Sequence, residues 1–295
     1  MYPKKLLVCD LDNTLYDWVG YFVPSFNAMV EAALPIIGCD REQLLDDLRE
    51  VHQRHHDSEQ PFALIESSIV QRRFAGMSLA EMAKALDPAF HAFNSTRKKT
   101  LRLNPGVMEG LSSLHRAGII LVAHTESRLY GAFDRLLRLE ILRYFRKVYC
   151  RERPASVHPN EAASAAWLNK VPMSLVRELA HHQAKPDPDV LLEICRTEGV
   201  EASDTAYVGD SVARDILMAK RAGVFAIWAE YGAKHDRSLY ADLVRVTHWT
   251  PDEVAREERL RAEARSIRPD YTASSSFLDV LAPLGMDAAK VMVAR

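Results

Sequence analysis

The stretch Leu6-Leu7-Val8-Cys9-Asp10-Leu11-Asp12-Asn13-Thr14-Leu15 decides the fold, because a short apolar strand ends there on two carboxylates. Successive strand side chains point to opposite faces, so Asp10 and Asp12 are directed at the same space. Like charges this close repel unless a cation binds between them or one carboxyl keeps its proton. Such a pair can supply a nucleophile and a proton donor. A capped turn after a strand uses the same residue types, so the assignment depends on distant partners.

The composition is that of a soluble globular chain with one large or two modest domains: 295 residues, 48% hydrophobic and 26% charged. A formal net charge of −2 argues against a nucleic-acid partner. The longest apolar runs are too short to cross a bilayer, and only four apolar residues follow Lys4 and Lys5, unlike a secretory signal. The four cysteines have no metal-site spacing. We therefore expect reduced thiols and a cytoplasmic location.

From residue 106 onward, short apolar runs alternate with helical patterns, which indicates an α/β fold with a mostly parallel sheet covered on both faces. Strands are predicted at 119–123, 147–150, 206–208 and 225–229, with an edge strand at 271–272. Ligands bind beyond the carboxyl ends of strands in such sheets. Asp10, Thr125 and Asp210 fall at or just past such ends.

Residues 17–105 show helical spacing without a convincing strand, at 21–37, 41–56, 62–74 and 78–86. We expect them to form an all-helical cap domain inserted after the carboxylate turn. The core domain would then comprise residues 1–16 and 106–295. Two stretches, 151–182 and 234–268, look like additions to that core. The second contains a helix that Thr250 would cap, with Pro251 in its first turn.

Four motifs follow one another in the chain. They are the run 10–14, Thr125, Lys185 in the sequence Lys-Pro-Asp-Pro-Asp, and Asp210 with Asp215 in the run 209–215. In this order they resemble the haloacid dehalogenase superfamily, and more narrowly its phosphatases with a helical cap after the first strand. The resemblance spans residue 6 to about residue 232. It implies a Rossmann-like core with a small all-helical cap domain.

The resemblance also implies a catalytic pair and a metal. Asp10 would be the nucleophile that takes the phosphoryl group, and Asp12 the general acid and then base. A magnesium ion would be held by Asp10, the backbone carbonyl of Asp12, and Asp210, with Ser211 and Asp215 in support.

For the phosphate group, the resemblance implies the Thr125 hydroxyl, the Lys185 ammonium, and backbone N–H groups near Leu11 and Glu126. Family members often carry Asn or Gly at the position of Glu126. An acid facing a phosphate is unfavourable, so we expect the Glu126 side chain to turn away.

The expected function is a Mg²⁺-dependent phosphomonoesterase acting on a small phosphorylated metabolite, with no nucleic-acid or membrane partner; a homodimer is left open. Asp12 argues against the dehalogenase branch, whose reaction needs no acid there. A phosphomutase would use the same residues. A phospho-accepting receiver-like signalling module is a further alternative, although a receiver has no helical lid.

Three other features have open roles. His52, His55 and His56 share one helix face, where zinc binding is conceivable and a solvated face is the better interpretation. His124 lies inside an apolar run, which favours a hydrogen-bonded core histidine. Arg128 follows Thr125 closely, and it either reaches a second anionic group of the substrate or lies on the surface.

Overall fold

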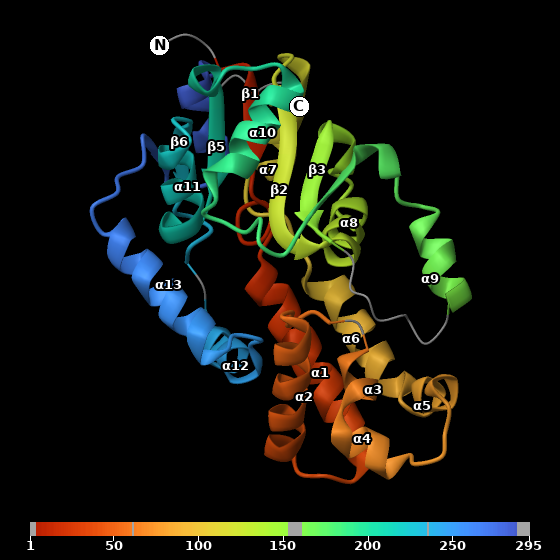
Figure 1. The fold of residues 1–295 in the computed structure, drawn as a ribbon. Helices are drawn as coiled ribbons and strands as arrows, with labels where there is room; N and C mark the ends of the chain where they lie inside the picture. The colour runs from red at the N-terminus through yellow and green to blue at the C-terminus, as the bar shows by residue number, and fades with distance from the viewer. Residues whose placement is uncertain (1–3, 61, 153–160, 235, 288–295) are drawn as a thin grey trace.

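The computed structural model describes residues 4–60, 62–152, 161–234 and 236–287. Seven parallel strands form one sheet in the order β4-β3-β2-β1-β5-β6-β7 (Figure 1). The strands are β1 (Leu6–Cys9), β2 (Ile120–Arg128), β3 (Lys147–Arg151), β4 (Val176–Leu179), β5 (Thr205–Gly209), β6 (Phe225–Ala229) and β7 (Tyr271–Ala273). The predicted Rossmann-like α/β fold is confirmed, including the edge strand after residue 270.

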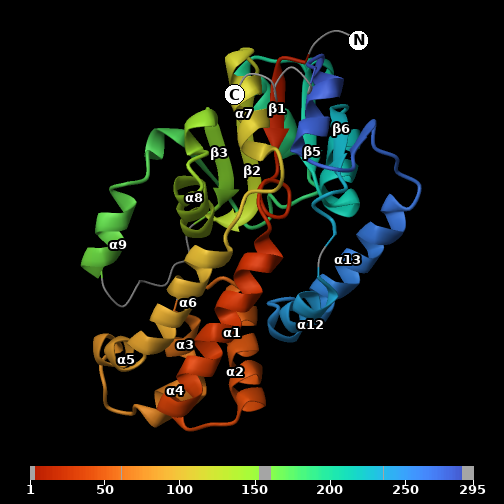
Figure 2. The ribbon, with the colours of Figure 1, turned by 180° about the vertical axis from the view of Figure 1, so that it is seen from behind.

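Helices cover both faces of this sheet (Figures 1 and 2). They are α7 (Val107–Arg116), α8 (Leu129–Arg138), α10 (Pro188–Glu198) and α11 (Leu217–Arg221), with short 3-10 turns at Leu142–Tyr144, Met173–Leu175, Ala202–Asp204 and Phe277–Leu284. The helix α9 (Glu161–Leu168) stands apart from the sheet (Figure 1), and its Trp167 packs on Tyr130 of α8. The central strand β1 is apolar at every position because both of its faces are buried. Leu7 and Cys9 belong to the cluster that includes α7 and α8, whereas Leu6 and Val8 belong to the cluster with α10 and α11. Burial on both faces therefore accounts for the absence of alternation.

Residues 18–100, called the helical segment below, lie beyond the carboxyl ends of the strands (Figure 1). The segment comprises α1 (Trp18–Ile37), α2 (Arg41–His55), α3 (Ala63–Glu66), α4 (Ser68–Arg73), α5 (Leu79–Ala85) and α6 (Asp87–Thr100). The range predicted as one helix over 62–74 is two short helices, because Ser67 caps the second by accepting from the backbone N–H of Val70. The division into a core domain and a cap domain stays a prediction.

The turn after β1 sets the entry into the helical segment. Asn13 adopts a left-handed conformation with φ of 60°. Asp17 then caps α1 by accepting from the backbone N–H of Gly20 at 2.8 Å. On the return, Asn104 donates to the Asn13 carbonyl at 2.6 Å. The two segments that connect the sheet to the helical segment are thus hydrogen-bonded to each other next to Asp10 and Asp12.

Residues 236–264, called the strap below, connect the sheet to the helical segment and consist of α12 (Arg237–Val246) and α13 (Pro251–Ala264). α12 packs on α1 and α2, and α13 packs on the π-helical turn Val212–Ile216 after β5. The helix expected after Thr250 is present, with the reciprocal hydrogen bonds of a capping box to Glu253. Figures 1 and 2 show the strap (blue) beside both parts of the molecule.

Two expectations about the sheet need correction. β2 does not end near Thr125 but continues to Arg128, with a register shift against β3 between His124 and Arg128. The stretch 151–182 contains β4, which extends the sheet; residues 153–160 of it lie outside the described residues.

Among the described residues, no single helix is both long and apolar enough to span a bilayer. The pair α1 and α2 meets the criterion only when joined across a 116° bend.

Candidate active site

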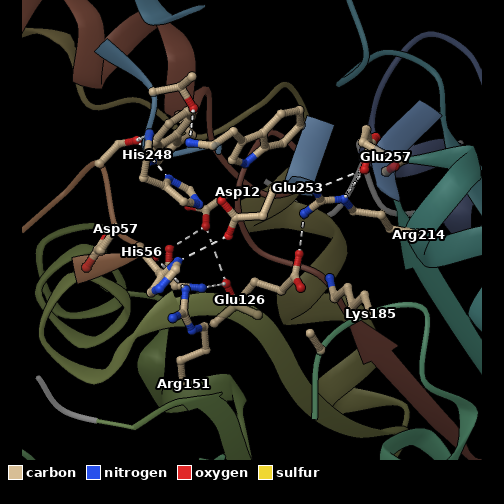
Figure 3. Close-up of a pocket in the computed structure, with 18 of the residues that line it drawn as sticks. Asp12, His56, Asp57, Glu126, Arg151, Lys185, Arg214, His248, Glu253 and Glu257 are labelled. Atoms are coloured by element: carbon tan, nitrogen blue, oxygen red, sulfur yellow. Dashed lines mark hydrogen bonds and ion pairs between the residues drawn. The ribbon is translucent and has the colours of Figure 1, made fainter. Parts of the chain in front are cut away.

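Asp10 after β1, Thr125 within β2 and Asp210 after β5 line a cavity of about 670 Å³, part of which Figure 3 shows. Residues of the helical segment and of the strap close it from the other sides. All eight side chains predicted for the site line this cavity: Asp10, Asp12, Thr125, Glu126, Lys185, Asp210, Ser211 and Asp215. Their roles are not tested by this placement and stay predictions.

Asp10 is the most constrained of these groups. It is 5% exposed; its Oδ2 accepts from the Thr14 hydroxyl at 2.8 Å and its Oδ1 from the Lys185 ammonium at 2.5 Å. Burial raises the pKa of Asp10 to about 7, against the opposing effect of the Lys185 charge. The carboxylate therefore depends on nearby positive charge to stay ionised.

Lys185 supplies part of that charge. Burial opposes its ionisation, but Asp10 and Asp215 raise the pKa of Lys185 well above its ordinary value. Its second partner is Asp215, at 2.8 Å. Asp215 is fixed in turn by the Tyr207 hydroxyl at 3.1 Å and the backbone N–H of Ser211 at 3.0 Å. A permanently charged lysine is thus held against the first carboxylate.

Gly209 permits this arrangement. A Cβ on Gly209 would lie 2.3 Å from Cγ of Asp215. The glycine that ends β5 is therefore required for the close approach of that carboxylate.

Asp210 completes an acidic cluster. Carboxylate oxygens of Asp10, Asp210 and Asp215 lie within 4.8 Å of one another. Burial, followed by the charges of Asp10 and Asp215, raises the pKa of Asp210 well above its ordinary value. Asp210 has no ion-pair partner within the described ranges, in contrast to Asp10 and Asp215. These hard oxygen donors fit a small divalent cation such as Mg²⁺, whose charge would relieve the repulsion between them.

Asp12 points toward a different set of donors. Its Oδ2 accepts from the Ser127 hydroxyl at 2.6 Å and from the Thr125 hydroxyl at 3.3 Å. Its Oδ1 lies 3.2 Å from Nη2 of Arg135. Asp12 therefore contacts the predicted phosphate ligand Thr125 but neither Asp10 nor Lys185.

Arg135, on α8, was not predicted from the sequence. It is 1% exposed and donates from Nη2 to the Ser127 hydroxyl at 2.6 Å and from Nε to the Tyr16 hydroxyl at 2.9 Å. Its Nη1 binds Glu59 of the helical segment at 2.6 Å. One buried guanidinium thus joins the sheet, the turn after β1 and the helical segment around Asp12.

Glu126 lies in the wall of the cavity, and the expectation that its side chain turns away from the phosphate stays a prediction. Glu126 accepts from Nη1 of Arg214 at 2.5 Å, and Arg214 also pairs with Glu257 of the strap at 3.0 Å (Figure 3). Burial opposes ionisation of Glu126, whereas the Arg214 and Lys185 charges lower its pKa below the ordinary value. The Glu126 carboxylate is therefore compensated by Arg214.

The three histidines at the end of α2 occupy three different environments, and that of His56 is exposed, with its Nδ1 3.3 Å from Oε1 of Glu253. His52 is buried and its Nδ1 lies 2.7 Å from the Val246 carbonyl of the strap, so the interpretation as a solvated face is wrong for it. His55 pairs with Glu66 at 2.6 Å. In the described part of the chain they form no candidate metal group.

His124 is a core residue, 1% exposed. Burial, then the Lys185 charge, lowers the pKa of His124 well below its ordinary value, so the ring is neutral. Its Nδ1 has no hydrogen-bond partner among the residues described, contrary to the expected hydrogen-bonded state.

Arg128 does not line the cavity. It pairs with Asp57 at 3.1 Å and donates to the His55 carbonyl at 2.5 Å, so it fastens the helical segment to the end of β2.

Comparison with known proteins identifies the class. A family model of haloacid dehalogenase-like hydrolases matches residues 4–223. The chain therefore belongs to the haloacid dehalogenase-like hydrolase family. The predicted recognition and the assignment as an enzyme are confirmed.

Two curated relatives are phosphatases. Glyceraldehyde 3-phosphate phosphatase of Methanopyrus kandleri is 25% identical over 243 residues, which cover 79% of this chain and 86% of that protein. Phosphoglycolate phosphatase of Pseudomonas fluorescens (strain Pf0-1) is 26% identical over 80% of this chain and 72% of that protein. Among solved structures, the 2-haloacid dehalogenase of Pseudomonas syringae pv. Tomato DC3000 has a TM-score of 0.52 and 23% identity over 98% of both chains. That likeness shows the fold alone.

Proposed function

We propose that this hydrolase is a Mg²⁺-dependent phosphomonoesterase that acts on a small phosphorylated metabolite through an aspartyl-phosphate at Asp10. The observation that carries the proposal is the buried carboxylate of Asp10, held by Lys185 and Thr14 beside the acidic cluster with Asp210. The phosphatase activity named for two relatives supports the same reaction class.

In the first step, an oxygen of Asp10 attacks phosphorus and the bond from phosphorus to the ester oxygen breaks. Asp12 gives its proton to the departing alkoxide. Lys185 and the Thr125 hydroxyl stabilise the charge on the phosphoryl oxygens, together with the backbone N–H groups near Leu11 and Glu126. The products are an aspartyl-phosphate and an alcohol.

In the second step, Asp12, now a carboxylate, takes a proton from a water molecule that attacks the same phosphorus. The bond to the Asp10 oxygen breaks, which returns the carboxylate and releases inorganic phosphate. Asp12 regains its proton in this step, so the cycle closes.

The cation would be held by Asp10, the Asp12 carbonyl and Asp210, with Asp215 and Ser211 as supports. When bound, it neutralises phosphoryl oxygens and the acidic cluster. Lys185 supplies a further positive charge beside Asp10, and its contacts with Asp10 and Asp215 fix the position of its ammonium group.

The test is hydrolysis of p-nitrophenyl phosphate with added MgCl₂. Asp10→Asn should lower turnover by roughly 1000-fold or more, because an amide oxygen is a poor nucleophile. EDTA should abolish the wild-type activity and excess Mg²⁺ should restore it.

Asp17→Asn is the matched control. It makes the same substitution in the same loop, and Asn caps a helix about as well as Asp. Wild-type activity of Asp10→Asn would refute the nucleophile. Transfer of the phosphoryl group to a second sugar phosphate rather than to water would favour the phosphomutase alternative. Membership in the hydrolase family leaves the receiver-like alternative without support.

A further inference from the structure

Arg151, at the end of β3, differs from most arginines around the cavity. Its contacts among the described residues are neutral: Nη1 donates to the His56 carbonyl at 3.1 Å, and Nη2 lies 3.2 Å from Nδ1 of His181. No ion pair of Arg151 occurs in the described part of the chain. Among the described residues no carboxylate is in direct contact with Arg151, although its charge opposes the burial that raises the pKa of Asp57 and adds to the lowering of the pKa of Glu126 by Arg214.

Three neighbouring arginines form ion pairs with carboxylates. Arg128 pairs with Asp57, Arg135 with Asp12 and Glu59, and Arg214 with Glu126 and Glu257. Arg256 also lines the cavity and has no carboxylate partner within the described ranges, but its Nη2 donates to the Lys185 carbonyl at 3.2 Å. Arg151 thus lines the cavity without a direct ion pair to an acid among the described residues.

The sheet places Arg151 at a defined distance from Asp10. β3 is two strands from β1, which corresponds to roughly 10 Å across the sheet. The registers align Cys9 with Ala123 and Ala123 with Val148, so Arg151 stands further out along the strands than Asp10. Figure 3 shows Arg151 and His56 on one side of the cavity and Lys185 on the other, with Glu126 between them. Arg151 and Lys185 line the same cavity, so one small substrate molecule can contact both.

Two imidazoles accompany Arg151. The rings of His56 and His181 lie 5.2 Å apart, and both line the cavity. Glu253, the acid beside His56, accepts from the Thr250 backbone N–H at 2.7 Å and lies 3.3 Å from Nδ1 of His56. This capping role directs the Glu253 carboxylate to Thr250 and His56 rather than to Arg151.

Resting on the proposed function, we propose that Arg151, with His56 and His181, forms a subsite for a second anionic group of the substrate. The substrate class is then a small phosphomonoester that carries a carboxylate or a second phosphate a few carbons from the scissile ester. An arginine fork binds either anion with charge-assisted hydrogen bonds. From the sequence, contact with a second anionic group of the substrate was considered for Arg128; we propose this contact for Arg151 instead.

The experiment compares kcat/KM for three esters: ethyl phosphate, which has no second anion, phosphoglycolate, which has a carboxylate, and 1,3-propanediol bisphosphate. Wild type should prefer at least one anionic ester over ethyl phosphate. Arg151→Gln should lower kcat/KM for that ester by about 10- to 100-fold, the usual contribution of a charge-assisted contact, and change ethyl phosphate less than about twofold. Arg151→Lys should recover part of the loss, because it keeps the charge without the fork.

Arg177→Gln is the matched control. It makes the same substitution on the adjacent strand β4, outside the cavity, where Arg177 pairs with Glu193 at 3.0 Å. It should leave all three esters unchanged.

The outcomes separate the two proposals. Turnover of ethyl phosphate without any preference for an anionic ester, or a preference that survives Arg151→Gln, would overturn this inference alone. An equal loss on all three esters in Arg151→Gln would overturn it too, since the role would then be structural. If wild type hydrolyses none of the esters and no p-nitrophenyl phosphate, the proposed function fails and this inference with it. Circular dichroism of the variants verifies that they fold.

Discussion

Asp12 is the residue whose surroundings bear most directly on the proposed chemistry. Ser127, Thr125 and Arg135 hold its two oxygens, so its carboxylate is fixed in one orientation. The spacing of Asp10 and Asp12 predicted a shared site, and both line the same cavity. The spacing could not predict Arg135 or Ser127, because their contacts depend on how α8 and β2 pack.

For Asp12→Asn we expect kcat with ethyl phosphate to fall about 100- to 10,000-fold, because an alkoxide needs a proton to leave. With p-nitrophenyl phosphate, whose leaving group needs little protonation, formation of the intermediate should survive while its breakdown slows. A rapid-mixing experiment should then show a burst of p-nitrophenolate close to the enzyme concentration.

The control is Asp17→Asn, which should show neither effect. If Asp12→Asn hydrolysed ethyl phosphate at the wild-type rate, Asp12 would not be the acid–base group.

At the scale of elements, the pattern of apolar runs predicted the strands of the sheet centre well, because each is buried on both faces. β4 was missed because its sequence, Val-Arg-Glu-Leu, is half-exposed at the sheet edge and short. α6 was also missed: its chain is polar, with one fully buried residue, Ala89, so periodicity gives little signal. The helix after Thr250 was predicted from its cap, a local signal that does not depend on burial.

The contact between α2 and the strap predicts a dependence of stability on pH. His52 of α2 is buried against the Val246 carbonyl, and burial lowers its pKa from 6.5 to about 4. As pH falls through 6.5, the unfolded state binds a proton that the folded state refuses until about pH 4. Stability is therefore lost over this window on acidification, by up to about 3 kcal/mol for this histidine.

Urea unfolding of wild type and His52→Gln between pH 7.5 and 4.5 measures this loss. Wild type should lose more free energy of unfolding on acidification than His52→Gln. The control is His91→Gln, at an exposed position on α6, which should follow wild type. Parallel curves for wild type and His52→Gln would show that the buried imidazole does not titrate as expected.

At the scale of the whole molecule, the strap contacts both the sheet side and the helical segment, and its purpose was not apparent from the sequence. Arg245 pairs with Asp46 of α2 at 2.7 Å, and Asp242 accepts from Asn27 of α1 at 2.9 Å. At its other end, Glu257 and Glu263 pair with Arg214 and Arg221 of the sheet side. The partners in the pairs between the strap and the helical segment lie about 200 residues apart in the chain, so these pairs leave no local pattern in the sequence.

This bridging predicts that the sheet and the helical segment unfold together. Differential scanning calorimetry should give one transition, with a calorimetric enthalpy equal to the van't Hoff enthalpy. Two resolved transitions would mean that the strap does not couple the two parts.

Arg135 has one further consequence. Its guanidinium is shared between Asp12 on the sheet side and Glu59 in the helical segment, so a single cation serves two elements at once. Were residues 56–60 displaced, Glu59 would withdraw and the balance of charge around the proton-transferring carboxylate would change with it. One movement would then control both access to the cavity and the ability of Asp12 to transfer a proton. This coupling would slow reaction with water while the cavity is open.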